Sequence, residues 1–367
     1  VNALTAQINA QPIPTAAPPP PLPQTPAVTP VSHAAPVAGG STAPATTIGG
    51  RMYYTFSQID QERDGVHQAP SGAGLEVKRF YLSVDHRFSE VFSANLTTDF
   101  QYAPAIASTE LFVKKAYLQG RASEALTLRI GAADTPWIPY AEEVYGYRWI
   151  ETTVADRTRF GGSADWGVHA FGKVPGTVVS YAVAVLDGGG HRNPSRSKHM
   201  DLEGRISAKF DDVNLAVGGY SGQLGRDIEG ASALHTARRF DALAAYTPEK
   251  FRIGVELFVA ENWNNVTLIA TDASRGYSAF GSYLFNKRLS AFARYDHVEP
   301  TRTTAPAREE DYFNLGVTYS PIRNVDIAMV YKHDAVENGV IATSNGAIGG
   351  GRTGTYDEVG VWGQLRF

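Results

Sequence analysis

The chain has 367 residues, of which 43 % are hydrophobic and 19 % are charged, and its formal net charge is −4. The charges are spread along the sequence without a basic stripe, so we do not expect a nucleic-acid-binding protein. The chain contains no cysteine, which excludes disulfides, thiolate metal sites and covalently attached haem of the CxxCH type.

The N-terminal segment, residues 1–46, contains most of the prolines and few apolar side chains. This composition predicts an extended or disordered low-complexity segment that packs no core and serves as a spacer; a ligand for an SH3-type domain is the weaker alternative. A signal peptide has a basic region followed by an apolar run, and the first residues show neither feature. The protein is therefore either cytosolic or in its mature form, and the strand pattern that follows favours the mature form.

From residue 47 to residue 367 the chain consists of short segments in which apolar and polar residues alternate. This alternation is typical of β-strands, and each segment has about the 9–11 residues that a tilted strand needs to cross a bilayer. No run approaches the length of about 18 apolar residues that a transmembrane helix requires. The sixteen predicted strands cover residues 47–57, 74–88, 92–102, 111–122, 125–134, 163–174, 177–187, 199–210, 213–223, 237–247, 251–261, 275–285, 288–298, 310–320, 325–334 and 355–367.

The connections between these strands alternate between short turns and long loops. An even number of strands with this rhythm is typical of an up-and-down transmembrane barrel with both termini on the periplasmic side. A soluble sandwich does not need such regularity, and a lipocalin-type barrel uses about eight strands. Aromatic residues also gather near the strand ends, as they do in interfacial girdles. The last residues, VGVWGQLRF, resemble the C-terminal assembly signal of bacterial outer-membrane barrels.

One stretch, residues 135–160, interrupts the alternation and is rich in aromatic and charged side chains. A loop of this length without secondary structure of its own is either functional or disordered, and this one is too aromatic for disorder. It follows the fifth predicted strand and is therefore the third long loop. We refer to residues 135–160 as the third loop.

These features together resemble those of a known protein family. Residues 47–367 look like a sixteen-stranded bacterial porin in strand count, loop rhythm and terminal phenylalanine. Residues 126–159 are similar to the phosphate-selective porin group, in which an Arg-x-Gly strand leads through Thr-Pro-aromatic into a long acidic and aromatic loop. The matching residues are Arg129, Ile130, Gly131, Thr135, Pro136, Trp137, Glu142, Tyr147, Ile150 and Arg157.

The resemblance implies a homotrimer in the outer membrane of a Gram-negative bacterium, with one channel per subunit and outer-membrane lipid and lipopolysaccharide around it. We expect an all-β fold: a 16-stranded antiparallel transmembrane β-barrel wide enough to hold water, with a third loop that folds inward, narrows the channel and keeps its charges solvated. Small hydrophilic solutes and ions would diffuse through it passively. The predicted constriction residues are Trp137, Tyr140, Glu142, Glu143, Tyr147, Arg148 and Arg157, and the predicted basic wall is Arg79, Lys115 and Arg129.

The polar faces of the predicted strands carry nearly balanced charge, whereas a dedicated phosphate channel would need a ladder of arginines. Anion preference therefore stays open at this point. The basic lumen candidates are Arg79, Arg87, Lys115, Arg121, Arg129, Arg205, Lys209, Arg252, Arg288, Arg294, Lys332 and Arg366. The acidic ones are Asp85, Asp99, Asp201, Glu203, Asp241, Glu256, Asp296, Asp326, Asp334 and Glu358.

Other functions remain as alternatives. The aromatic residues of the third loop could let sugars slide by stacking, or the loop could plug a structural barrel that does not conduct. An enzyme is not expected, because none of the nine scattered histidines lies in a Gly-x-Ser-x-Gly or His-Glu-x-x-His context. We expect no catalytic residue, no metal site and no cofactor, although a sheath around a separate cytochrome is conceivable.

Overall fold

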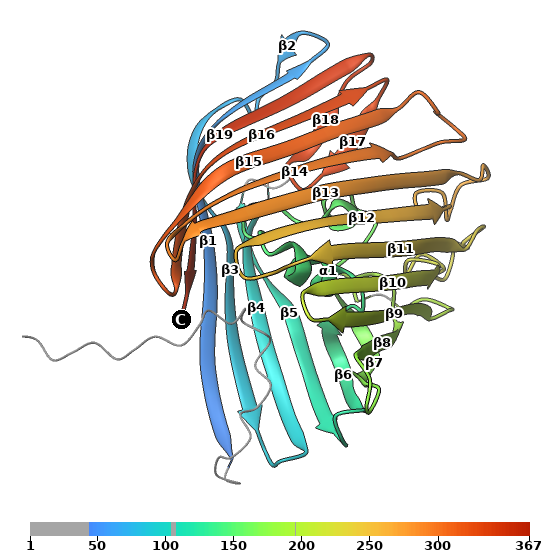
Figure 1. The fold of residues 1–367 in the computed structure, drawn as a ribbon. Coiled ribbons are helices and arrows are strands. Elements are labelled where there is room, and N and C mark those ends of the chain that lie inside the picture. The colour runs from blue at the N-terminus through green and yellow to red at the C-terminus, as the bar shows by residue number, and fades with distance from the viewer. Residues whose placement is uncertain (1–43, 104–107, 195) are drawn as a thin grey trace, which may run out of the picture. The chain divides into compact units, whose positions relative to one another are not determined.

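The computed structural model describes residues 44–103, 108–194 and 196–367. They form a closed antiparallel barrel of sixteen strands, which closes where β1 pairs with β19 (Figure 1). The expectations for residues 1–43 lie outside the described residues. The barrel strands are β1 (Ala45–Arg63), β3 (Gly72–Arg87), β4 (Phe92–Ala103), β5 (Ser108–Arg121), β6 (Thr127–Asp134), β7 (Ala164–Lys173), β8 (Val179–Leu186), β9 (Asp201–Phe210), β10 (Val213–Gly222), β11 (Ala237–Tyr246), β12 (Phe251–Glu261), β13 (Ala273–Asn286), β14 (Leu289–Glu299), β15 (Glu309–Ile322), β16 (Val325–Glu337) and β19 (Thr353–Arg366).

All sixteen predicted strands are confirmed. Several continue further at the long-loop end than we predicted, and β1 runs to Arg63 instead of ending near residue 57. These extensions carry charged residues such as Asp60 and Glu62, so the apolar alternation that reveals strands in the sequence has already ended there. Three further strands lie in predicted long loops: β2 (Val66–His67), β17 (Val340–Thr343) and β18 (Gly346–Gly349).

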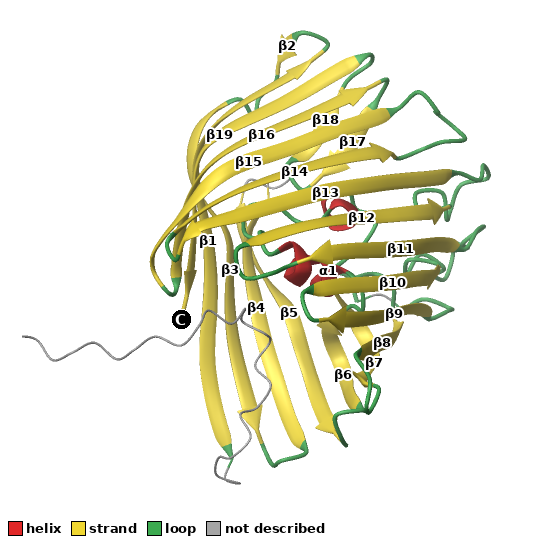
Figure 2. Cartoon of the chain, in the orientation of Figure 1, coloured by secondary structure: helices red, strands yellow, loops and turns green. Residues whose placement is uncertain are grey.

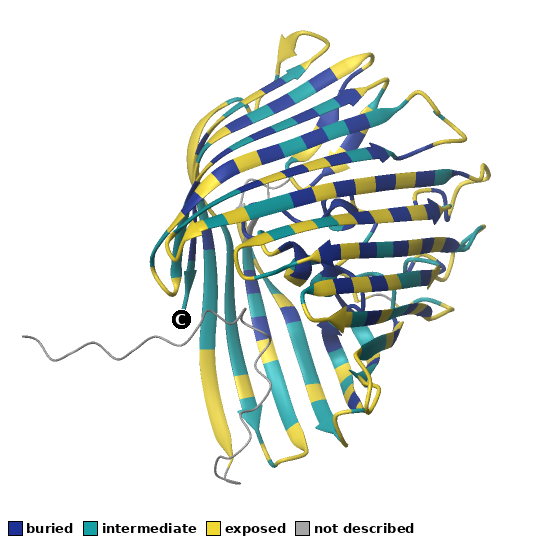
Figure 3. Ribbon diagram, viewed as in Figure 1, coloured by how far each residue is buried: buried dark blue, intermediate teal, exposed yellow. Residues whose placement is uncertain are grey.

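Apolar side chains cover the outside of the barrel, and polar side chains face the interior, which gives the striped burial pattern of Figure 3. On β9, for example, Ile206 is 59 % exposed, whereas Asp201 and Glu203 are 0 % and 3 % exposed. This arrangement is the reverse of a water-soluble protein and suits a barrel surrounded by lipid. Among the residues that the structure describes, no helix is long and apolar enough to span a membrane.

Two β-bulges change which residues face the interior. Lys78 is an extra residue in the β1–β3 ladder, and Lys114 is an extra residue in the β4–β5 ladder. A bulge places two residues of one strand opposite a single residue of the other. As a result both members of the pairs Lys78–Arg79 and Lys114–Lys115 have partners on the inner side of the barrel.

The third loop lies inside the barrel and contains two helices, α1 (Ile138–Tyr145) and α2 (Val154–Arg157), drawn in red in Figure 2. Our expectation of a loop without secondary structure was therefore wrong. Gly146 ends α1 in the left-handed conformation, at a φ of 81°, and its N–H bonds to the carbonyl oxygen of Glu142 at 2.9 Å. Helices this short are not stable alone, so packing against the barrel wall holds them.

Candidate functional site

Aromatic side chains attach the third loop to one side of the barrel interior. The backbone N–H of Trp137 bonds to Glu203 at 3.1 Å, and its indole N–H bonds to Glu256 at 3.0 Å. Phe160 packs on Phe258 with ring centroids 4.7 Å apart. Trp137 and Phe160 are almost completely buried, so these rings anchor the loop against β9 and β12.

A buried ionic cluster holds the second half of the loop. Arg157, on α2, is 0 % exposed and bonds to Glu310 at 2.7 and 3.1 Å, Asp296 at 3.0 Å and Asp334 at 3.2 Å. Its guanidinium also lies 4.0 Å from the ring centroid of Tyr312. Bidentate arginine–carboxylate bonds are strong and geometrically specific. Arg157 is therefore removed from solvent, because this part of the loop packs against the barrel wall.

Glu151 provides a second ionic contact. It accepts a bond from the ammonium group of Lys332 at 3.1 Å and from the hydroxyl of Ser344 at 2.7 Å. Burial alone would raise the pKa of Glu151, but the positive charges of Lys332 and Lys78 outweigh burial and hold that pKa well below its usual range. The third loop is thus tied to β16 by a carboxylate that stays charged.

The opposite side of the loop faces the strands β3–β6. Arg148 forms an ion pair with Glu142 of the same loop and donates to the hydroxyl of Tyr81, on β3, at 3.4 Å. Arg79 donates to the same hydroxyl at 3.4 Å, and the Lys114 ammonium lies 5.1 Å from the Tyr81 ring centroid. One cation of the loop and two of the wall therefore contact the side chain of Tyr81.

The two glutamates of α1 differ in accessibility. Glu142 is bound to Arg148 and only 14 % of its side chain is exposed, while Glu143 is exposed. Burial raises the pKa of Glu142, although Arg148 acts in the opposite direction. Tyr140 packs on the Arg205 guanidinium at 4.1 Å, and Tyr147 contacts Ser290 at 3.2 Å.

All three predicted residues of the basic wall lie on the inner face, with 14–19 % of each side chain exposed. Arg79 pairs with Asp99 at 2.5 Å, and Lys115 pairs with Asp134 at 2.6 Å. Arg129 lies 3.9 Å from Asp134 and is stacked between the rings of Tyr117 and Phe171. Arg79 lies beside Arg148, whereas Lys115 and Arg129 form a separate group at the end of β6, where the third loop begins.

The bulge lysines Lys78 and Lys114 were missed as lumen residues by the sequence reasoning. The sequence does contain a signal for the bulge at Lys114. The outward apolar residues fall on odd positions before it, at Leu111 and Val113, and on an even position after it, at Leu118. Such a change of parity within one strand marks an extra residue.

The accessible charge of the lumen is not balanced. Eight of the ten acidic candidates are buried, at 5 % exposure or less, and only Asp85 and Asp326 are not. Of the twelve basic candidates, only Arg294 and Lys332 are buried. Most of the sequestered carboxylates lie on β9–β16, on the side to which the loop is attached. Among these strand candidates, the basic side chains are therefore more accessible than the acidic ones.

Comparisons with family models and with curated proteins give no match. Among solved structures, the barrel is similar to the anion-selective porin from Comamonas acidovorans, with a TM-score of 0.66 and 10 % identity over 88 % of this chain and 100 % of that one. It is also similar to the outer membrane channel DcaP of Acinetobacter baumannii, with a TM-score of 0.63 and 10 % identity over 89 % and 99 %. Salmonella typhi OmpF in complex with daunomycin gives 0.59 and 11 % over 88 % and 97 %. These similarities establish a porin-type barrel fold.

Proposed function

We propose that this protein is an outer-membrane channel for the passive diffusion of small hydrophilic solutes, and that it prefers anions. The apolar outer surface suits lipid, and a sixteen-stranded barrel leaves an aqueous interior. The third loop lies within that interior. It is attached to one side of the wall, and its Arg148 side chain reaches Tyr81 on the other side.

The excess of accessible cations in the lumen supports anion preference more than any other observation. Wall charges of one sign raise the local concentration of counter-ions, and the charge rings of a pore set its ion selectivity. Several of the carboxylates that balance the count in the sequence are buried and form ion pairs: Asp296 with Arg157 and Arg294, Asp241 with Arg239, and Glu358 with Lys332. A passing ion therefore interacts chiefly with the basic side.

A channel specialised for sugars has less support. Stacking requires exposed rings along the path, but Trp137, Tyr145 and Trp149 are 5 % exposed or less. Only Tyr140 and Tyr147 remain partly accessible, and both contact wall residues. Aromatic residues of the loop thus act as anchors in this arrangement.

The cellular setting belongs to the same proposal. We place the barrel in the bacterial outer membrane, with its termini in the periplasm, lipid and lipopolysaccharide around it, and three copies in a homotrimer. One solved structure of this fold, OmpT of Vibrio cholerae, is described as a trimer form, with a TM-score of 0.58 and 13 % identity.

Ion replacement in planar bilayers tests the proposal. We expect stable conductance steps in KCl from the purified protein, and a larger loss of current when chloride is replaced by gluconate than when potassium is replaced by N-methylglucamine. Absence of steps from correctly folded protein would favour the plugged barrel. A larger loss on replacing potassium would reject anion preference.

A further inference from the structure

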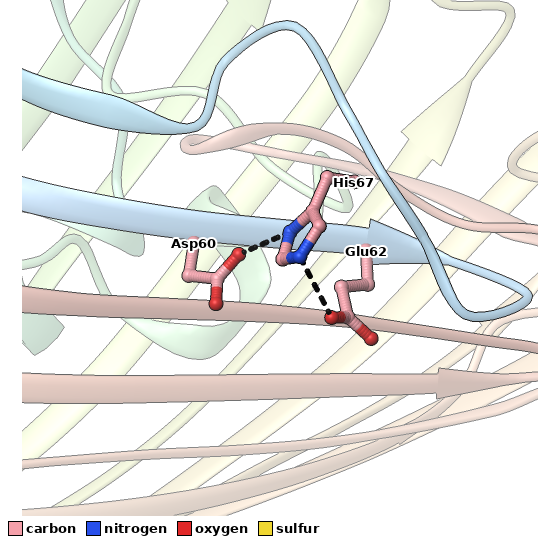
Figure 4. Close-up of side chains that lie close together, drawn as sticks. All are labelled: Asp60, Glu62 and His67. Atoms are coloured by element: carbon pink, nitrogen blue, oxygen red, sulfur yellow. Dashed lines mark hydrogen bonds and ion pairs between the residues drawn. The ribbon is translucent and has the colours of Figure 1, made fainter.

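A histidine and two carboxylates meet on the outer face of the barrel, at the long-loop end of β1 (Figure 4). The Nδ1 atom of His67 lies 2.9 Å from Oδ1 of Asp60, and its Nε2 atom lies 3.6 Å from Oε1 of Glu62. One ligand atom from each residue lies within 4.8 Å of the other two. Among the residues that the structure describes, no other group of three such side chains is this close.

The local fold brings these three side chains together in a defined register. Asp60 and Glu62 are two residues apart on β1 and therefore share its outer face. Asp64 and Gly65, both with positive φ, form a two-residue turn after which β2 pairs back on β1, with His67 directly opposite Glu62. Two-residue turns of this kind are the tightest hairpin connections.

The turn is itself held in place. The carboxylate of Asp64 accepts hydrogen bonds from the backbone N–H groups of Gly351, Arg352 and Thr353, at 2.8–2.9 Å. These bonds tie the hairpin to the loop before β19 and lower the pKa of Asp64. The three side chains are thus presented by a backbone that is already ordered, which reduces the entropy that a ligand would have to remove on binding.

The electrostatics of the group favour a cation. Asp60 lies directly opposite Asp357 on β19, and like charges in this position destabilise a strand pair. The carboxylate of Asp357 is engaged by Tyr331 and His333. A neutral imidazole has one N–H donor and one acceptor nitrogen, so His67 can satisfy only one of its two carboxylates and turns a lone pair toward the other.

We propose that Asp60, Glu62 and His67 form a binding site for a divalent transition-metal ion of the Zn²⁺ type. Zinc combines imidazole nitrogen with carboxylate oxygen, and three protein ligands leave one coordination position open. The open position faces the outside, because the three side chains are 40–68 % exposed. The ion would join β2 to β1 across the hairpin and stiffen the first long loop. This proposal does not depend on the channel function.

Titration of Zn²⁺ into the tag-free protein in detergent, with the heat of binding measured by calorimetry, tests the site. We expect one saturable Zn²⁺ per chain, at least about tenfold weaker binding in His67→Ala and in the double variant Asp60→Asn/Glu62→Gln, and unchanged binding in His333→Ala. His333 is the matched control, because it also lies on the outer face but its ring contacts a single carboxylate, Asp357.

Each variant is first checked for the heat-dependent gel mobility of a folded barrel, so that a loss of binding reports the site. Absence of saturable binding in the wild-type protein would overturn the proposal. So would binding that survives His67→Ala, or a loss of equal size in His333→Ala. Mg²⁺ should compete poorly, since it prefers all-oxygen ligands; competition at equal concentration would show that the carboxylates act only as a diffuse negative surface and would reject the site.

Discussion

Replacing Arg157 by methionine should release the third loop from the wall. The change removes the one loop cation that bonds to Asp296, Glu310 and Asp334, all of which are 0 % exposed. Removing one partner from a buried ion pair costs about 3–5 kcal/mol, which corresponds to a change of roughly two to more than three orders of magnitude in the equilibrium between attached and detached loop. The barrel should survive, because its strand ladders do not depend on the loop.

Single-channel recording is the assay for this prediction. A detached loop should give noisier steps of altered size and a reduced anion preference, and limited proteolysis should then cut within residues 135–160. Arg159→Met is the matched control: Arg159 is exposed, and its side chain donates to the carbonyl oxygen of Thr343 at 3.1 Å instead of to a buried carboxylate. The reasoning is refuted if the Arg157→Met channel is indistinguishable from the control in noise, step size and cleavage.

Three further predictions concern the loop and its surroundings. Arg129→Met should lower the ratio of anion to cation permeability, because Arg129 belongs to the basic wall and 15 % of its side chain is exposed; an unchanged ratio would contradict its role. Trp137→Phe removes a bond to buried Glu256 and should lower the free energy of unfolding in urea by about 1–3 kcal/mol, and no change would argue against the anchor. The folded-state pKa of Glu151 is lowered, so its contribution to stability is complete above the unfolded pKa of about 4.3 and is lost as the pH falls through the folded pKa. Channel noise should therefore stay flat from pH 8 to about pH 5 and rise only in stronger acid, and Glu151→Gln, noisy at every pH, should abolish that rise.

The barrel was predictable because each strand carries its own signal. Alternating residues such as Leu202 and Ile206 against Asp201 and Glu203 show in the sequence which side meets lipid. The position of the third loop followed from counting strands. Its two helices could not be predicted, because their stability comes from contacts with strands up to 177 positions away in the sequence, as in the bond from Arg157 to Asp334.

The distribution of accessible charge was also beyond the reach of the sequence. Asp296 and Asp85 both face the interior, but Asp296 is buried against Arg157 of the third loop, whereas Asp85, near the short-turn end of β3, is exposed. The burial of Asp296 depends on where the third loop packs, and the pattern of a strand contains no information on that. Counting both residues as lumen charges led to the expectation of nearly balanced charge. In the folded chain, only Asp85 of the two is accessible.

The reversal potential in a salt gradient is the most direct test of the central claim, that the accessible lumen is positively charged. With unequal KCl concentrations on the two sides of a bilayer, we predict a zero-current potential of the sign that chloride permeation produces. Its size should fall as the salt concentration rises, because screening shortens the reach of the wall charges. A potential of the opposite sign, or one close to zero at low salt, would contradict the account.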